Sequence, residues 1–158
     1  VVPPEGIFPG MEPQQGTYQE TDEDKNEVVF ALQVMRTLGE IRDKEALSVI
    51  KKGWDEYGVE KERNYHLLTL ARLGDFSGIN DLVTKLKEDY AQDTAEEIRL
   101  RTGIIEVIGD YLAKRSDNQL QGLIEFLSEE GAYPEIRGAA ESVLTAITKS
   151  VPEKKKSE

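Results

Sequence analysis

The 158-residue sequence contains no cysteine, so disulfides, thiolate metal sites and thiol nucleophiles are all excluded. This absence leaves the compartment open, because both reducing and oxidising locations tolerate it. Long apolar runs are also missing. No stretch approaches the roughly 18 consecutive apolar residues that a membrane-spanning helix needs, so we expect a soluble body without a transmembrane segment.

Basic residues are in the minority, with 20 lysines and arginines against 31 aspartates and glutamates and a net charge of −11. A field of this sign repels phosphate backbones and anionic lipid surfaces, so we expect no nucleic-acid partner. Hydrophobic residues make up 38% of the chain. At this length the composition predicts one domain with a sizeable core.

Proline is absent from residues 14–133, which is typical of a helical body. Residues 1–23 are instead rich in proline, glycine and glutamine and predict a flexible arm, before a body over 24–151 and a charged tail over 152–158. A start at Val1 rather than Met is what removal of a signal peptide, a lipid-anchored segment or other upstream sequence would leave. With the arm, it favours a secreted or lipid-anchored protein of the bacterial envelope.

Apolar residues spaced three and four apart predict seven helices. The first begins near Asp24 and ends at Gly39, and its apolar residues cover two faces, including Val29, Phe30 and Val34. A helix of this kind is expected between two neighbours. The other six are predicted from the capping residue Asp43 to Gly58, Tyr65 to Leu73, Ile79 to Tyr90, Asp93 or Thr94 to Leu112, Leu120 to Leu127, and Pro134 to about Lys149.

A Leu-Gly or Ile-Gly pair recurs every 35 residues, ending at Gly39, Gly74 and Gly109. A fixed period of that size is typical of stacked units, each too small to bury its own apolar face. We therefore predict an all-α fold, an α-solenoid of about three and a half helix-turn-helix repeats.

The units resemble HEAT repeats, in the short form also seen in the phycobilin-lyase group. The resemblance rests on LGEIRDKEALSVI from Leu38, LARLGD from Leu70 and YPEIRGAAESVLTAI from Tyr133, with Glu97-Ile98-Arg99 echoing Glu135-Ile136-Arg137. It implies an armadillo-like superhelix with a concave surface formed by the second helix of each pair. The 35-residue step is closer to the 34 of tetratricopeptide repeats, but the aromatic expected there is replaced by Arg42, Ser77 and Leu112.

No catalytic, cofactor or metal site emerges from the residues. Some HEAT-like proteins are two-iron hydroxylases that need several His-Glu pairs, which the lone His66 cannot supply. Asp22, Asp24 and Asn26 match the opening of a calcium loop, but Glu27 and Gln33 stand where that loop needs glycine and glutamate. These acids instead suit the positive end of a helix.

Aromatic residues leave two interpretations open. Trp54 and Tyr57 could form a binding hot spot, yet they continue the apolar stripe of their helix, which favours the core, and Tyr90 and Phe126 are interpreted likewise. The alternative function is a lyase-like or cofactor-handling module, in which Trp54 would line an apolar cavity of roughly 300 Å³ or more.

The favoured function is a non-enzymatic scaffold that binds a protein or peptide on a mainly acidic concave surface. Self-association through the exposed terminal helix is a further expectation, because a solenoid without a polar cap exposes an apolar end. The residues expected to contact the partner lie opposite the apolar stripes of the second helices: Ser48, Lys51, Lys52, Asp55, Asp81, Thr84, Lys85, Glu88, Gln121 and Glu125.

Overall fold

The computed structural model describes the backbone of residues 22–89 and 94–156, and the side chains of residues 25–89 and 94–149. This part of the chain is all-helical and contains no strand, which confirms the all-α prediction. Two short 3₁₀ helices, η2 (Lys44–Ala46) and η3 (Glu60–Glu62), precede α2 and α3. The α-helices are α1 (Asp22–Glu40), α2 (Leu47–Tyr57), α3 (Arg63–Arg72), α4 (Ile79–Lys87), α5 (Ala95–Leu112), α6 (Asn118–Glu130) and α7 (Pro134–Lys156).

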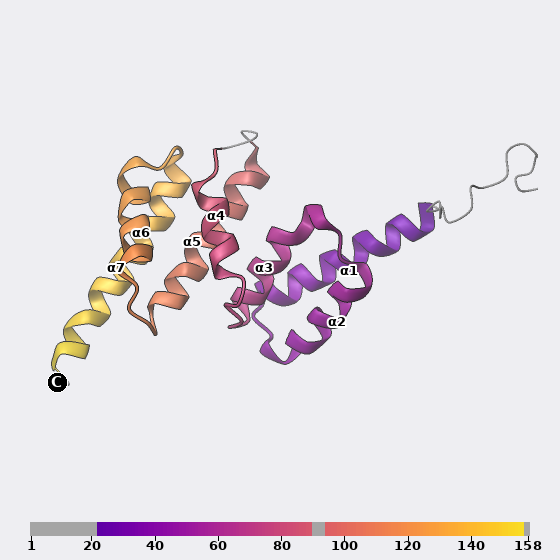
Figure 1. Cartoon of the computed structure of the whole chain (residues 1–158), viewed down its shortest axis with the longest axis horizontal. Helices are drawn as coiled ribbons and strands as arrows, with labels where there is room; N and C mark the ends of the chain where they lie inside the picture. Colours follow the sequence, from indigo (N-terminus) through magenta and orange to yellow (C-terminus); the bar gives the residue numbers. More distant parts are fainter. Residues whose placement is uncertain (1–21, 90–93, 157–158) are drawn as a thin grey trace, which may run out of the picture.

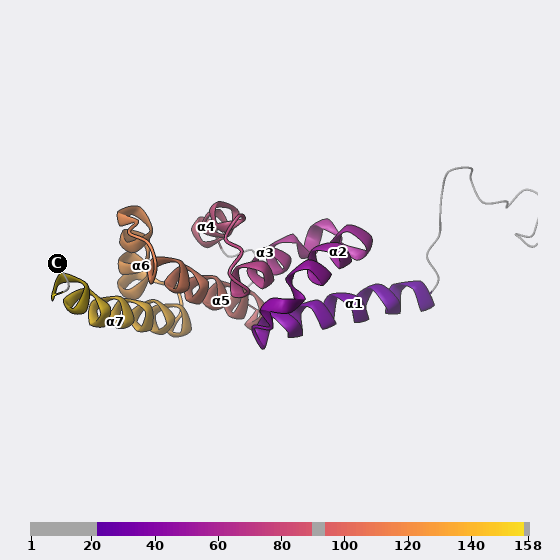
Figure 2. The same ribbon diagram turned by 90° about the horizontal axis from the view of Figure 1, so that it is seen from below.

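The helices follow one another along an elongated molecule, with α1 and α7 at opposite ends (Figure 1). One row consists of α1, α3, α5 and α7, each packed on the next. The other three helices, α2, α4 and α6, lie on one side of that row, as Figure 2 shows from below. Each of them packs on the helices that precede and follow it in the chain.

Side-chain caps begin the helices where the sequence offers a short oxygen-bearing residue. The Thr94 hydroxyl accepts a hydrogen bond from the Glu97 backbone N–H at 3.1 Å, as predicted for the start of α5. Asp43 accepts one from the Glu45 backbone N–H at 3.2 Å and begins η2 directly before α2. Asp117 starts α6 in the same way through the Leu120 N–H, at 3.1 Å.

The recurring glycines do not occupy equivalent places. Gly39 and Gly109 lie inside α1 and α5, where a Cβ would come within 2.7 Å of Thr69 Cγ2 and 2.9 Å of Val143 Cγ2. Only Gly74 takes the left-handed conformation that ends a helix, with φ of 94°. After α1, Arg42 takes the left-handed conformation instead, with φ of 58°. The prediction that Gly39 ends the first helix is therefore wrong.

The helix spacing also departs from a constant 35 residues. The second helices begin at Leu47, Ile79 and Asn118, 32 and 39 residues apart. The two steps differ because α3, the first helix of the second pair, has 10 residues, whereas α5, the first helix of the third pair, has 18. The Leu-Gly and Ile-Gly pairs thus recur at a constant spacing in the sequence but do not occupy equivalent positions in the structure.

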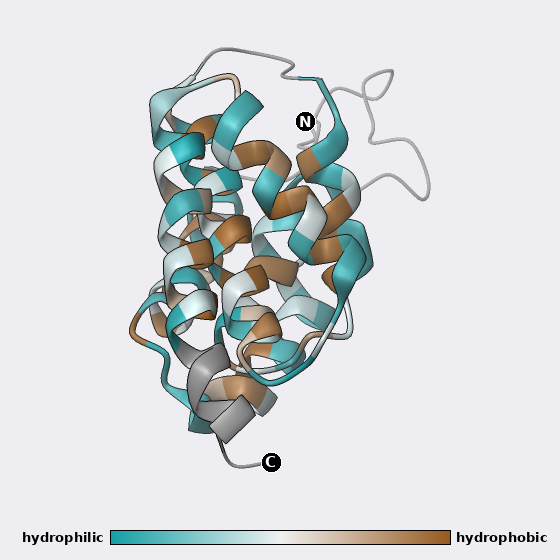
Figure 3. Cartoon of the chain, turned by 90° about the vertical axis from the view of Figure 1, so that its left-hand side faces the viewer, coloured by the Kyte–Doolittle hydropathy of each residue, from teal (hydrophilic) through white to brown (hydrophobic). Residues whose placement is uncertain are grey.

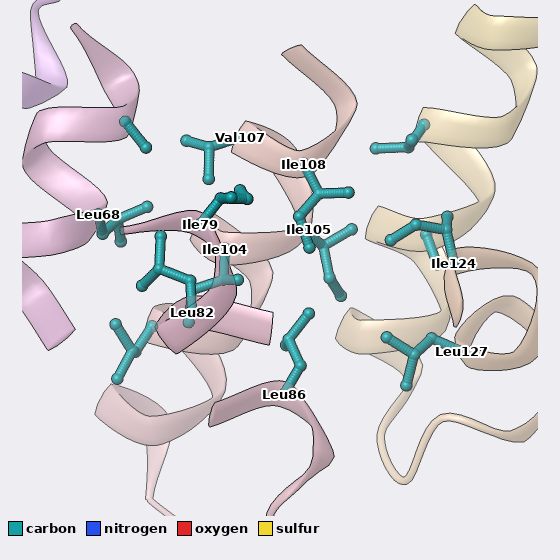
Figure 4. Close-up of a cluster of buried hydrophobic side chains, with 14 of the residues drawn as sticks. Leu68, Ile79, Leu82, Leu86, Ile104, Ile105, Val107, Ile108, Ile124 and Leu127 are labelled. Atoms are coloured by element: carbon teal, nitrogen blue, oxygen red, sulfur yellow. The ribbon is translucent and has the colours of Figure 1, made fainter. Parts of the chain in front are cut away.

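Apolar side chains gather between the row of α1, α3, α5 and α7 and the three helices beside it, α2, α4 and α6. In Figure 3 hydrophobic residues alternate with hydrophilic ones around each helix, as the 3.6-residue period requires. The larger cluster extends from α3 to α7, with Ile104, Ile105 and Ile108 of α5 between Leu82 of α4 and Ile124 of α6 (Figure 4). A smaller, separate cluster joins α1 and α2 to α3: Met35, Ala46, Ile50, Leu70 and Leu73.

The two end helices differ from their predictions. Only one side of α1 is covered: Met35 is buried, but Phe30 is 67% exposed and Val34 40%. Within the described chain α1 has two neighbours, α2 and α3, but the residues predicted to form its second apolar face, Val29, Phe30 and Val34, are exposed, so the expectation that both faces are covered is wrong. At the other end, α7 continues seven residues past Lys149 to Lys156, so the residues from 152 to 156 are helical.

Candidate functional site

The predicted contact residues are spread over three helices on one side of the molecule (Figure 2). Four lie on α2, three on α4 with Glu88 at its C-terminal cap, and two on α6. Because these helices pack mainly on the first helices of the pairs rather than on one another, the structure groups the predicted residues within each helix, not into one cluster.

On α2, three of the predicted residues are exposed and make no ion pair within the described chain: Ser48, Lys52 and Asp55. Lys51 differs, since its Nζ lies 2.8 Å from Asp75 Oδ2 in the turn between α3 and α4. The hydrogen bond from Lys51 holds the pKa of Asp75 below its usual value. Lys51 thus ties α2 to the next helix pair.

On α4, most of the predicted polar atoms are already engaged inside the chain. Asp81 pairs with Arg63 at 2.8 Å and raises the pKa of that guanidinium. The Thr84 hydroxyl donates to the Asn80 carbonyl at 3.0 Å. The Lys85 side chain is only 14% exposed, and its Nζ lies 3.0 Å from Glu97 and 3.8 Å from Glu88. Lys85 therefore belongs to the contact between α4 and α5.

On α6, Gln121 is half-buried and donates a long hydrogen bond, 3.4 Å, to the exposed Glu125. Phe126 beside them is 57% exposed, so its interpretation as a core residue is wrong. It lies next to Glu125 on the outward side of the helix, while Ile124 and Leu127 are buried. Tyr90, interpreted in the same way, lies outside the described residues.

Trp54 is a half-buried packing residue. Its ring stacks on His66 with centroids 4.3 Å apart and planes 6° from parallel. Burial, together with the charge of Arg63, lowers the pKa of His66. The pocket with Trp54 in its wall measures about 10 Å³, far below the roughly 300 Å³ of a small-molecule site. This geometry does not favour the aromatic-cleft alternative.

Tyr57 is partly exposed, and its hydroxyl donates to Glu27 at 3.2 Å, joining α2 to α1. Glu56, and then Glu27, raise the pKa of Tyr57. These contacts place Tyr57 at an edge between helices and not in the wall of a cavity with Trp54.

A pocket of about 330 Å³ lies between η3, α3, α4 and the start of α5 and has a mainly polar and charged lining. Tyr65 lies in it, beneath the Arg36 guanidinium, which sits 3.8 Å from the ring centroid and pairs with Glu62. Burial and Glu96 raise the pKa of Tyr65 to about 12. Within the described residues, no three carboxylate or histidine side chains are placed to hold a metal ion.

Arg101 is the charged residue whose role the sequence patterns did not reveal. It is 1% exposed, its Nε donates to Glu97 at 2.7 Å, and its Nη atoms donate to the Glu88 and Asp89 carbonyls at 2.8 and 3.2 Å. Burial alone would raise the pKa of Glu97, but hydrogen bonds from Arg101 and Lys85 outweigh it and lower that pKa. Arg101 thus fixes the end of α4 against α5.

Arg137 repeats this arrangement one helix pair later, because its Nη1 donates to the Gly131 carbonyl at the end of α6, at 2.7 Å. Leu100 and Ile136, which directly precede Arg101 and Arg137, are both buried, whereas Arg99 is exposed. The sequence echo between Arg99 and Arg137 is therefore out of register by two residues. The signal that could have found Arg101 is its place in the apolar stripe of α5, four residues after Glu97.

Comparison with known protein families, curated proteins and solved structures finds no match to this chain. In the described part of the chain, no helix combines the length and the apolar character that crossing a bilayer requires.

Proposed function

We propose that the chain is a protein-binding module, an α-solenoid of the HEAT type that docks a protein or peptide on the side formed by α2, α4 and α6. The observation that carries the proposal is the order of the helices. Successive helix pairs pack neighbour on neighbour, and their second helices come to one side of the molecule (Figure 2). Stacked pairs of this kind create extended surfaces that bind by area.

The chemistry of that side favours a partner with basic groups. Its exposed carboxylates include Asp55, Glu88 and Glu125, while two of its lysines, Lys51 and Lys85, are paired within the chain. Complementary charge accelerates encounter and selects among partners more than it adds affinity. The exposed Phe126 lies beside Glu125 and offers the aromatic anchor that protein interfaces often use.

The internal ion pairs also determine which residues are suitable for a test. Lys51, Asp81 and Lys85 hold neighbouring elements together, so replacing them would disturb the fold as well as the surface. Asp55 and Glu125 are exposed and make no ion pair in the described chain. Changes at these two positions leave the ion pairs between helices intact.

The experiment first identifies a partner by cross-linking and affinity capture, and then measures its affinity for two charge-matched variants. Asp55→Lys with Glu125→Lys should weaken binding about tenfold or more. Glu106→Lys with Glu141→Lys makes the same charge change at exposed positions of α5 and α7 and should leave the affinity nearly unchanged. Equal weakening by both pairs would mean that the partner senses net charge and not this side of the molecule.

A further inference from the structure

Arg42 stands where the next helix pair has a glycine. In the turn after α1, the Arg42 N–H donates to the Gly39 carbonyl at 3.0 Å, and the N–H of the following residue donates to the Leu38 carbonyl at 3.2 Å. The turn after α3 repeats both hydrogen bonds, with Gly74 in the place of Arg42. This pattern is the Schellman motif, whose left-handed position is usually a glycine. Arg42 and Gly74 are therefore equivalent positions of the first two helix pairs.

The left-handed backbone costs stability at Arg42 but not at Gly74. Their φ angles are 58° and 94°, and Arg42 is the one non-glycine residue with a positive φ in the part of the chain that the structure describes. Glycine has no Cβ and adopts this conformation freely, whereas the Cβ of an arginine is crowded by the backbone. Residues that depart from the local preference tend to have a role elsewhere, so the contacts of the Arg42 side chain are informative.

The Arg42 guanidinium links three successive helix pairs. Its Nη1 lies 2.9 Å from Asp110 Oδ2 near the end of α5, and it donates to the carbonyl of Arg72, the last residue of α3, at 3.3 Å. The C-terminal ends of α1, α3 and α5 thus meet at one cation, where the helix dipoles favour positive charge. This is the one described link from the first pair, α1 and α2, to the third, α5 and α6.

Away from this link, α3 separates α1 from α5 (Figure 2). A cavity of about 100 Å³ lies between the three helices, with Arg36 and Glu40 of α1 and Glu96 and Arg99 of α5 in its walls. The first pair thus faces the third across a charged gap rather than through packed apolar side chains. Its apolar contact with α3 is the smaller core cluster, which has five buried residues.

We propose that Arg42 is a strap that holds the first helix pair at a fixed angle to the third, and that its release lets α1 and α2 pivot on α3. The strap consists of the Arg42 guanidinium, the Asp110 carboxylate and the Arg72 carbonyl. Burial lowers the pKa of Arg72, whose side chain is a second cation at this point, while the carboxylates of Glu40 and Glu106 oppose that effect. These carboxylates, from α1 and α5, also offset the repulsion between the two arginines.

The strap is suited to release because it is exposed to solvent. The Arg42 and Asp110 side chains are 46% and 43% exposed, so salt screens their attraction. The smaller core cluster holds the first pair to α3 by apolar burial, which screening does not weaken, and release therefore changes an angle without unfolding the pair. Ser48, Lys52 and Asp55 move with α2, so the strap also determines whether the proposed docking side is continuous from α2 to α6.

Pulsed EPR distance measurements on the full chain test the proposal. The chain has no cysteine of its own, so Ser48→Cys on α2 and Gln119→Cys on α6, both at exposed positions, place one spin label on each of the two pairs. The distances between the labels should form a single narrow peak at low salt. Raising the salt concentration from about 0.01 M to about 1 M cuts the Debye length roughly tenfold, and the single peak should then be lost.

Arg42→Asn releases the strap without disturbing the turn. Asparagine adopts the left-handed conformation more readily than most residues, but its side chain is too short to reach Asp110. The single peak should be lost at low salt, and added salt should have no further effect. Lys44→Asn makes the same charge change two residues later, at an exposed lysine with no ion pair in the described chain, and should leave the narrow peak in place.

Asp110→Ala distinguishes a strap from a simple helix cap. It removes the ion pair with α5 but leaves the hydrogen bond from Arg42 to the carbonyl at the end of α3, and it should broaden the distances as Arg42→Asn does. A narrow peak in Asp110→Ala would mean that Arg42 only caps α3, and the strap would be wrong. An unchanged peak at the higher salt concentration would overturn the proposal without any variant at these positions, because helix packing alone would then fix the angle. All distances are measured without a partner, so the outcome does not depend on the proposed docking.

Discussion

Arg101 is a buried cation that donates to the Glu97 carboxylate on its own helix and to backbone carbonyls at the C-terminal end of α4 and just after it. Replacing it with Met keeps the aliphatic length but leaves the Glu88 and Asp89 carbonyls without their donor and Glu97 with Lys85 alone. Hydrogen bonds from a charged group are worth about 1.5–3 kcal/mol each, and removing one partner of a buried pair costs about 3–5 kcal/mol. We expect Arg101→Met to lower the free energy of unfolding by about 3 kcal/mol, measured by urea denaturation.

Arg99→Met is the matched control, because Arg99 lies two residues earlier on the same helix and is exposed. Its effect should stay within about 0.5 kcal/mol, as for most surface substitutions. If the two variants had the same free energy of unfolding, the hydrogen bonds of Arg101 would stabilise the fold no more than hydrogen bonds to water do.

His66 allows a direct titration because it is the only histidine. Burial against Trp54 lowers the pKa of His66 below 6.5, its value when exposed. The unfolded chain therefore binds the proton more readily. The contribution of His66 to stability is fully present above about pH 6.5 and is lost as pH falls through the lowered folded value.

An NMR titration should give a pKa below 6.5 for His66 in the folded chain and close to 6.5 in urea. Trp54→Leu removes the stacked ring and should move the folded pKa toward the urea value. A folded pKa at or above the urea value would contradict the buried position of the imidazole.

At the scale of elements, the packing of the first helices depends on glycines that allow close approach. In Gly39→Ala the added Cβ would lie 2.7 Å from Thr69 Cγ2 and 3.2 Å from Thr69 Cα, so rotating the threonine side chain does not remove the clash. Overpacking costs about 1–3 kcal/mol, more than the gain of up to about 1 kcal/mol in helix propensity. We expect a net loss of stability, measured by thermal or urea unfolding.

Gly138→Ala is the matched control within α7, since nothing lies within 4 Å of its added Cβ. It should raise stability by up to about 1 kcal/mol through helix propensity alone. Stabilisation by Gly39→Ala as well would show that α1 and α3 are not in close contact.

The number of helices and the positions of their caps could be predicted from the sequence because these are local properties. Asp43 and Thr94 need only their own turn to act as caps, and the apolar stripes of α5 and α6 point inward wherever the helices pack. The place of Gly39 was not predictable in this way. Its role depends on Thr69, thirty residues later, and a helix-ending glycine and a close-packing glycine look alike in sequence.

Tertiary contacts also limited the prediction of the candidate site. The exposed sides of α2 and α4 could be located from the residues opposite their apolar stripes, and Ser48, Lys52 and Asp55 are indeed exposed. The pairs of Lys51 with Asp75 and of Lys85 with Glu97 cross between helices and leave no local pattern. The two apolar sides of α1 were visible in the sequence, but not which of them would be covered.

At the scale of the whole molecule, the two core clusters predict two regions of different stability. The larger cluster includes eleven residues of α5, α6 and α7, whereas the smaller one holds α1 and α2 to α3 through five buried residues. The helix pairs pack mainly on their neighbours, and the exposed Arg42–Asp110 ion pair is the one described link from the first pair to the third. Local opening in such a molecule should stay local. Amides of α1 and α2 should therefore exchange with deuterium faster than those of α5 and α7.

Two fully buried isoleucines on second helices, Ile50 in the smaller cluster and Ile124 in the larger, make this prediction sharper. Replacing either with Val costs about 1 kcal/mol, which speeds exchange roughly fivefold wherever that side chain limits opening. Ile50→Val should accelerate amide exchange in α1 and α2 and leave exchange in α6 and α7 unchanged. Ile124→Val should do the reverse. Uniform acceleration by both variants would mean that the helices unfold as one unit, and neighbour-to-neighbour stacking would then not describe how this molecule is held together.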